Sequence, residues 1–150
     1  MAEACGSGLL WERKTESVDT TDLAALKAAI RPNTKAIFIE TPSNPMMKVS
    51  DIAAISELAK ANNCLLIVDN TFLSPYFQQP LDLGADIVVH SGTKYLGGHN
   101  DVIAGFTVTK DEALYQRLNY LYKTTGACLP PMDSWLVLRG IKTLAIRMEQ

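Results

Sequence analysis

Four apolar residues followed by a carboxylate, Leu65-Leu-Ile-Val-Asp69, form a run that is too short and too continuously apolar for a surface helix. Such runs are typical of strands that are buried on both faces of a parallel sheet. Three further runs have the same character, and they cover residues 35–40, 86–90 and 102–108. The sequence therefore predicts four strands, which are short and largely apolar.

Amphipathic helical patterns lie between and after these strands. Leu23, Leu26 and Ala29 recur at helical spacing after capping residues at 19–22, and a second helix begins after Asp51. Two more helices are expected at about 111–123 and 133–149. This alternation predicts an α/β layer structure with a mostly parallel sheet. We expect one globular unit over residues 17–150, and residues 1–16 stay unassigned because they show no clear period.

The composition narrows the classes of function. Charged residues make up 20% of the chain and its net charge is −2, which argues against binding to a nucleic-acid backbone. No apolar run approaches the ~20 residues of a membrane span, and the N-terminal residues lack the apolar region of a signal peptide. The three scattered cysteines, Cys5, Cys64 and Cys128, fit reduced thiols in a cytoplasmic protein.

Polar residues follow three of the predicted strands directly. In parallel α/β sheets, ligands bind just beyond the carboxyl ends of the strands. The segments at 40–45, 69–72 and 90–101 occupy those places and are rich in polar, Pro or Gly residues. They are the candidate ligand-binding segments.

The stretch Ser91-Gly92-Thr93-Lys94 combines two hydroxyls, a glycine and a lysine. Hydroxyls and a closely approaching backbone suit a phosphate, and the lysine is either a point-charge contact or an amine for Schiff-base chemistry. The spacing does not match a P-loop. On its own, the stretch is weak evidence, because a four-residue match of this kind is more often a solvated lysine in a polar turn.

Asp69 and Asn44 add polar groups at the ends of two other strands. Asp69 is a candidate cap or turn residue, or a partner for a protonated pyridine nitrogen. Asn44 offers an amide, although the prolines around it also suit ordinary turn chemistry. Two histidines, His90 and His99, have no organised partners for a metal site. A hydrolase built on Ser91 lacks the Gly-x-Ser-x-Gly turn.

Taken in order, three motifs resemble those of the PLP-dependent enzymes of Cys/Met metabolism, the trans-sulfuration family. They are Glu40-Thr-Pro-Ser-Asn-Pro45, Val68-Asp69-Asn70-Thr71-Phe72, and His90-Ser-Gly-Thr-Lys-Tyr-Leu-Gly-Gly-His-Asn-Asp101. The segment from Asp133 to Met148 resembles the family's passage out of its cofactor domain. The likeness runs from about Val18 to Gln150.

The resemblance implies an incomplete PLP-dependent transferase fold of type I, the aspartate-aminotransferase-like large domain. It implies that Lys94 forms the Schiff base with pyridoxal 5′-phosphate (PLP), Asp69 meets the pyridine nitrogen, and Ser91 and Thr93 bind the phosphate. Asn44 is expected near the phenolic oxygen of the cofactor. Gly92 replaces the alanine usual in the family and leaves both hydroxyls in place. Arg139, in the exit segment, is expected to be structural.

Three hypotheses about function follow. The first is β- or γ-elimination or replacement on sulfur amino acids, as in cystathionine γ-lyase or γ-synthase, in family members that are homotetramers built from dimers. The second is a piece that binds PLP or is only structural, because the family's substrate-binding arginine and the residues that it places before the cofactor motifs have no match here. The third is an unrelated α/β phosphate-binding module.

Overall fold

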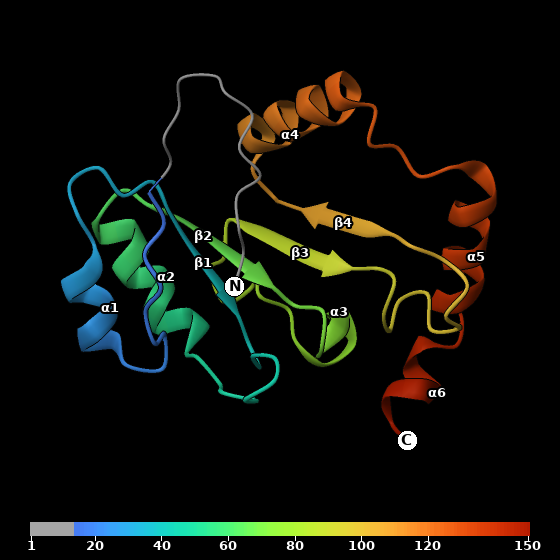
Figure 1. Ribbon diagram of the computed structural model, residues 1–150, viewed down its shortest axis with the longest axis horizontal. Helices are drawn as coiled ribbons and strands as arrows, with labels where there is room; N and C mark the ends of the chain where they lie inside the picture. The colour runs from blue at the N-terminus through green and yellow to red at the C-terminus, as the bar shows by residue number, and fades with distance from the viewer. Residues whose placement is uncertain (1–13) are drawn as a thin grey trace.

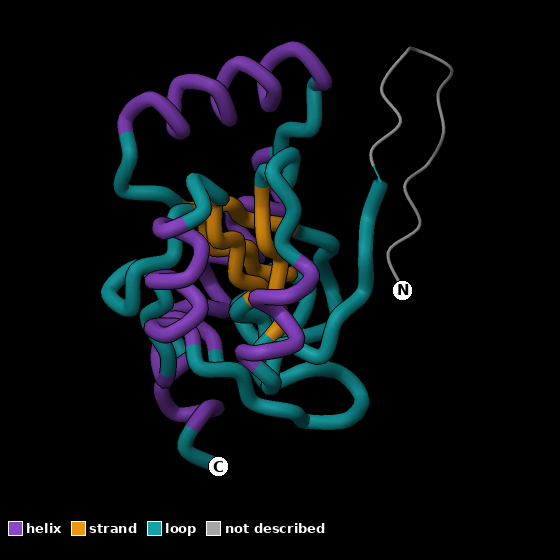
Figure 2. The backbone as a smooth tube through the Cα atoms, turned by 90° about the vertical axis from the view of Figure 1, so that its left-hand side faces the viewer, coloured by secondary structure: helices purple, strands orange, loops and turns teal. Residues whose placement is uncertain are grey.

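The computed structural model describes residues 14–150, so most of the unassigned segment 1–16, together with Cys5, lies outside the described residues. In chain order, the elements are α1 (Leu23–Ala29), β1 (Ala36–Glu40), α2 (Ile52–Ala61), β2 (Leu65–Asp69), α3 (Ser74–Phe77), β3 (Ile87–Ser91), β4 (Gly105–Val108), α4 (Glu112–Thr125), α5 (Pro131–Ile141) and α6 (Leu144–Met148). The strands lie at the centre with helices around them (Figures 1 and 2).

The four strands form one sheet in the order β1-β2-β3-β4. β1, β2 and β3 are parallel, and the register pairs Glu40 with Asp69 and Asp69 with Val89. The carboxyl ends of these three strands therefore meet at one edge of the sheet. The predicted α/β fold with a mostly parallel sheet is confirmed.

β4 runs antiparallel to β3, and Ser91 pairs with Gly105 where the two strands join. The loop between the two strands contains no helix that could cross the sheet. The chain therefore turns back and β4 pairs directly with β3. The expected strand at 102–108 begins only at Gly105. The backbone of Ala104 pairs instead with Thr93, whose N–H donates to the Ala104 carbonyl at 3.1 Å.

The main core lies between one face of the sheet and the helices α1 and α2. Ile55, Leu66 and Val68 are fully buried there. Asp22 and Asp51 cap the two helices by accepting backbone N–H groups of the first turn. These are the capping segments and helices that the sequence predicted. None of the described helices has the length and apolar character needed to cross a membrane.

The expected helix at 133–149 is wrong, because the chain forms two helices, α5 and α6, in its place. The carbonyl of Gly140 accepts the Thr143 N–H at 3.1 Å, three residues on, and also the Arg147 side chain at 2.8 Å. These two bonds replace the regular i+4 pairing and end α5. The short helix α3 was not predicted, since its sequence looks like a polar and aromatic loop.

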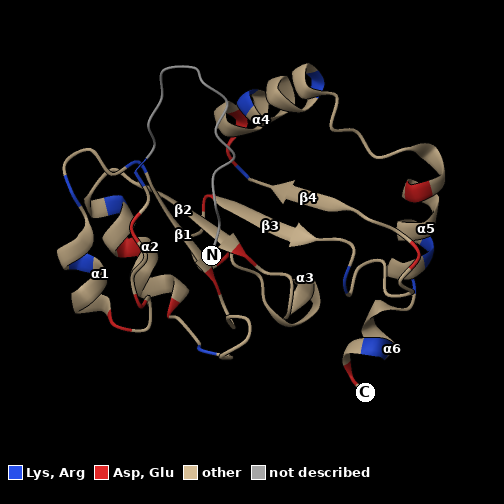
Figure 3. Cartoon of the chain, viewed as in Figure 1, with Lys and Arg blue, Asp and Glu red and all other residues tan. Residues whose placement is uncertain are grey.

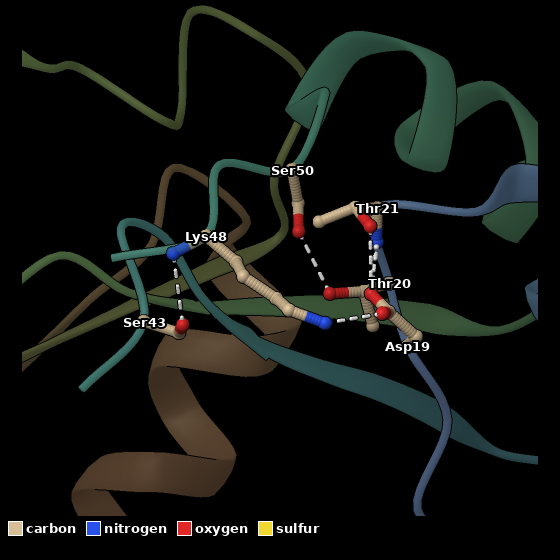
Figure 4. A network of polar contacts seen from close by, with 6 residues as sticks. All are labelled: Asp19, Thr20, Thr21, Ser43, Lys48 and Ser50. Atoms are coloured by element: carbon tan, nitrogen blue, oxygen red, sulfur yellow. Dashed lines mark hydrogen bonds and ion pairs between the residues drawn. The ribbon is translucent and has the colours of Figure 1, made fainter. Parts of the chain in front are cut away.

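A polar network fixes the chain before α1 against the loop that follows β1 (Figure 4). Lys48 forms an ion pair with Asp19, and the hydroxyls of Thr20 and Ser50 lie 2.7 Å apart. The backbone N–H of Lys48 donates to the Ser43 hydroxyl at 3.1 Å. The network thus anchors the turn that carries Asn44.

The ion pair gives a direct prediction for Asp19. The hydrogen bond from Lys48, together with weaker effects of the hydrogen bonds from the hydroxyl and N–H of Thr21, lowers the pKa of Asp19 from 3.8 to about 2. Replacement Lys48→Met should therefore raise the pKa of Asp19 toward 3.8, as measured by NMR titration of its carboxyl carbon. Because the folded-state pKa is the lower one, the stabilisation is present above about pH 3.8 and is lost as the pH falls toward 2.

The matched control is Lys27→Met, which removes the same charge from the exposed side of α1. Lys27 forms no ion pair with the other described residues. Equal pKa values for Asp19 in the wild type and in Lys48→Met would contradict the network.

Candidate active site at the strand ends

A cavity of about 600 Å³ lies at the edge where the three parallel strands end. Its size is within the range of small-molecule and cofactor sites. Acidic residues end β1 and β2, and one basic residue, Lys94, follows in the loop after β3 (Figure 3). The lining residues are Glu40, Asn44, Asp69, Thr71, Phe72, Ser91, Lys94, Tyr95, Gly98, Asn100, Arg147 and Gln150.

Lys94 lies in a tight turn directly after β3. Its N–H donates to the Ser91 carbonyl at 3.1 Å, and its own carbonyl accepts the Gly98 N–H at 2.7 Å. The amine makes no hydrogen bond or ion pair with any residue in the described range 14–150. Lys94 therefore presents an unpaired amine at the cavity from a backbone that is held at both ends of the turn.

Arg147 and two glycines support this turn from the α5–α6 side. The guanidinium donates to the carbonyls of Tyr95 and Gly140, both at 2.8 Å, and to the Thr143 hydroxyl at 3.1 Å. A Cβ on Gly98 would lie 2.3 Å from the guanidinium carbon, so the close stacking requires glycine there. Sequence reasoning missed Arg147, which lies more than fifty residues beyond Lys94.

Asp69 ends β2 and points its carboxylate to the cavity side of the strand. One oxygen, Oδ1, accepts both the N–H of Thr71 at 2.9 Å and its hydroxyl at 2.6 Å. Within residues 14–150, no hydrogen bond reaches the other oxygen, Oδ2. The carboxylate is therefore oriented by one oxygen and available through the other.

The structure brings Asn44, Asp69, Ser91 and Lys94 to one cavity, as the sequence predicted. Thr93 is not among the lining residues. Its hydroxyl lies 3.0 Å from the Ala104 nitrogen, which donates to it, and it holds the start of β4. The phosphate role of Thr93 stays a prediction, because its hydroxyl is used within the fold. The Ser91 hydroxyl, in contrast, makes no hydrogen bond within the described chain and is available to a ligand.

The cavity opens on the less covered face of the sheet. Side chains alternate between faces along a strand, so Asp69 shares a face with Ile67, and Ser91 shares one with Val89. Phe38, on the same face of β1, is 60% exposed, whereas the neighbouring Ile39 on the helix-covered face is 2% exposed.

A second cavity, of about 440 Å³, lies on the helix-covered side beside α3 and β4. Among its lining residues, only His90 has a titratable ring. The ring is buried, and burial lowers the pKa of this histidine below 6.5.

The described residues hold no group of three or more His, Cys, Asp or Glu side chains that could bind a metal ion. Arg139 pairs with Asp101 and packs on Trp135 outside both cavities.

The groups at the strand ends suit a ligand with an aldehyde, a basic ring nitrogen and a phosphate. An unpaired amine can condense with an aldehyde, and a carboxylate with one open oxygen can pair with a protonated ring nitrogen. The unpartnered hydroxyl of Ser91 can donate to a phosphate oxygen. The residues present therefore fit PLP.

Comparisons with known proteins agree with this chemistry. The family described as Cys/Met metabolism PLP-dependent enzyme matches residues 10–150. Cystathionine gamma-lyase of Bacillus subtilis (strain 168) is 58% identical over 132 residues, which cover 88% of this chain and 35% of the relative. Cystathionine gamma-synthase of Haemophilus influenzae is 56% identical over 133 residues, which cover 89% of this chain and 36% of the relative.

A solved structure gives the same result at the level of the fold. The crystal structure of cystathionine gamma-lyase from Lactobacillus plantarum complexed with L-serine matches with a TM-score of 0.86 and 58% identity. The match covers 87% of this chain and 34% of that chain. The chain thus spans about a third of the length of the relatives that it matches.

The contact behind the lysine turn gives a prediction for Gly140. A Cβ at this position would lie 2.1 Å from the Gly97 carbonyl oxygen and 2.7 Å from that of Leu96. Gly140→Ala must therefore displace backbone, and we expect it to lower the free energy of unfolding by about 1–3 kcal/mol. Denaturant titration followed by circular dichroism measures this change.

The control is Gly105→Ala, because a Cβ on Gly105 would lie 4.0 Å from the His90 carbonyl oxygen, its nearest neighbour outside the adjoining residues. An unfolding free energy of Gly140→Ala equal to that of the wild type would contradict the close contact between α5 and the lysine turn.

Proposed function

The chain belongs to the family of PLP-dependent enzymes of Cys/Met metabolism, and we propose that it is the cofactor-binding part of a trans-sulfuration enzyme. The reaction proposed for the intact protein is β- or γ-elimination or replacement on sulfur amino acids. The observation that carries the proposal is the meeting of Lys94, Asp69 and Ser91 at one cavity from the ends of two strands and the following turn. The cysteines Cys64 and Cys128 are free, which supports a cytoplasmic location as part of the proposal.

Each residue has a role that follows from its contacts. The Lys94 amine would bind the cofactor covalently and, once released, take the proton from Cα of the substrate and return it at a neighbouring atom. The open oxygen of Asp69 would accept a hydrogen bond from the ring nitrogen and keep it protonated. Ser91 would donate to the phosphate, and Asn44 would orient the ring edge. PLP, when bound, supplies an electron sink for charge that develops at Cα.

A second candidate is a piece that binds PLP without turning over substrate. An amino-acid substrate needs a cation for its carboxylate, and the described lining residues include only two, Lys94 and Arg147. Lys94 is assigned to the cofactor. Arg147 already donates to Tyr95, Thr143 and Gly140, so its guanidinium is committed to the turn. This favours a site whose cofactor contacts are more complete than its substrate contacts.

The first test is cofactor binding by the purified chain. After addition of PLP and removal of the excess, the wild type should keep a visible absorbance band, and borohydride followed by peptide mass spectrometry should place the cofactor on Lys94. Lys94→Ala should lose both signals, because Lys94 is the only amine among the described lining residues, and the guanidinium of Arg147 stays protonated and does not form a Schiff base. Lys123→Ala, on the exposed end of α4, is the control and should behave as the wild type.

Turnover separates the two candidates. Release of ammonia and an α-keto acid from cystathionine by the PLP-loaded chain would support the enzyme, and a bound cofactor without turnover would support the binding piece. A wild type with no visible band, or a cofactor attached equally in Lys94→Ala, would overturn the proposed site.

A further inference from the structure

The Thr71 hydroxyl replaces a backbone acceptor at the end of the hydrogen-bond ladder between β2 and β3. The last ladder bond here runs from the Asn70 N–H to the Val89 carbonyl at 2.9 Å. In a continuing parallel ladder, the Ser91 N–H would donate next to the carbonyl of Asn70. That carbonyl instead accepts the Ser74 N–H at 3.0 Å, because the chain turns into α3. The Thr71 hydroxyl accepts the Ser91 N–H at 2.8 Å in its place.

The hydrogen-bond directions at this hydroxyl are fixed. A threonine hydroxyl has one proton and two lone pairs. Since the backbone N–H of Ser91 can only donate, the Thr71 proton is free for Asp69 Oδ1, which lies 2.6 Å away. A bond to a carboxylate is stronger than one between neutral groups. The hydroxyl therefore joins the Asp69 carboxylate to the backbone of Ser91 across two strands.

A local turn would not need this second bond. An Asp followed two residues later by Thr commonly forms a side-chain turn, and the Thr71 N–H to Asp69 Oδ1 bond of 2.9 Å satisfies that turn alone. The bond to Ser91 is made with a residue twenty positions away, on another strand. It links the two residues proposed to contact opposite ends of the cofactor.

We propose that Thr71 is a positioning residue of the cofactor site. Its hydroxyl sets the orientation of the Asp69 carboxylate and ties it to the Ser91 backbone, so that the ring-nitrogen partner and the phosphate partner keep a fixed separation. Thr71 itself neither binds substrate nor moves a proton in the reaction. The role in cofactor binding rests on the proposed function, whereas the hydrogen bonds through Thr71 exist in the chain without it.

The first measurement uses the purified 150-residue chain without cofactor. Thr71→Val removes the hydroxyl at similar shape, and Thr71→Ser keeps it. NMR should show the Ser91 amide exchanging with solvent about tenfold faster or more in Thr71→Val, together with a changed carboxyl resonance of Asp69. Thr71→Ser and the exposed control Thr124→Val should match the wild type in both signals.

The second measurement is the affinity for PLP. Loss of a hydrogen bond to a charged group predicts about tenfold to a hundredfold weaker binding in Thr71→Val, with affinity restored in Thr71→Ser. The pH dependence of the visible band should also shift in Thr71→Val, which a purely structural role away from the ring nitrogen would not cause.

The outcomes separate this inference from the proposed function. An unchanged Ser91 amide and Asp69 carboxyl signal in Thr71→Val would overturn the link, whether or not PLP binds. Changed NMR signals with wild-type affinity for PLP would overturn the positioning role. A wild type that binds no PLP would overturn the proposed function and the cofactor role of Thr71 together, while the NMR result would still decide the link itself.

Discussion

The buried amide of Asn70 is the contact on which the geometry of the site depends. Its side chain is fully buried, and its Nδ2 donates to the carbonyls of Ser74 at 3.0 Å and Gln78 at 2.8 Å. Its oxygen accepts from the Gln78 amide at 2.8 Å. A buried amide that lost these partners would be costly, so the chain after β2 has one favourable path. That path directs Asp69 and Thr71 to the opposite face, toward the cavity.

The same contact reaches the neighbouring strands. The Gln78 side chain also donates to the Thr41 carbonyl, at 3.0 Å, and so couples the turn after β2 to the turn after β1. The Asn70 N–H pairs with Val89 in β3. One polar cluster therefore sets the relative positions of three strand ends, and the residues proposed to contact the cofactor extend from them.

Sequence reasoning found the parts of the site that lie at strand ends. An apolar run followed by a polar residue is a local signal, and it located Asp69, Ser91, Lys94 and the turn of Asn44 correctly at one edge. It could not find Arg147, because nothing near residue 147 indicates contact with a turn fifty residues earlier. Thr93 shows a different limit of sequence reasoning. The sequence does not indicate whether a threonine next to a lysine directs its hydroxyl to a ligand or, as here, to the neighbouring strand.

The face on which the cavity opens is consistent with the proposal that cofactor contacts are more complete here than substrate contacts. Parallel sheets are normally covered on both faces, and here α1 and α2 bury one face while Phe38 remains 60% exposed on the other. Asp69 and Ser91 extend from that second face, so in the proposed site both would contact one side of the ligand. The relatives are about two and a half times as long as this chain. In the proposed function, the described residues therefore contribute the cofactor contacts that extend from this face of the sheet, and the cavity remains open on the side away from the sheet, where a substrate would approach.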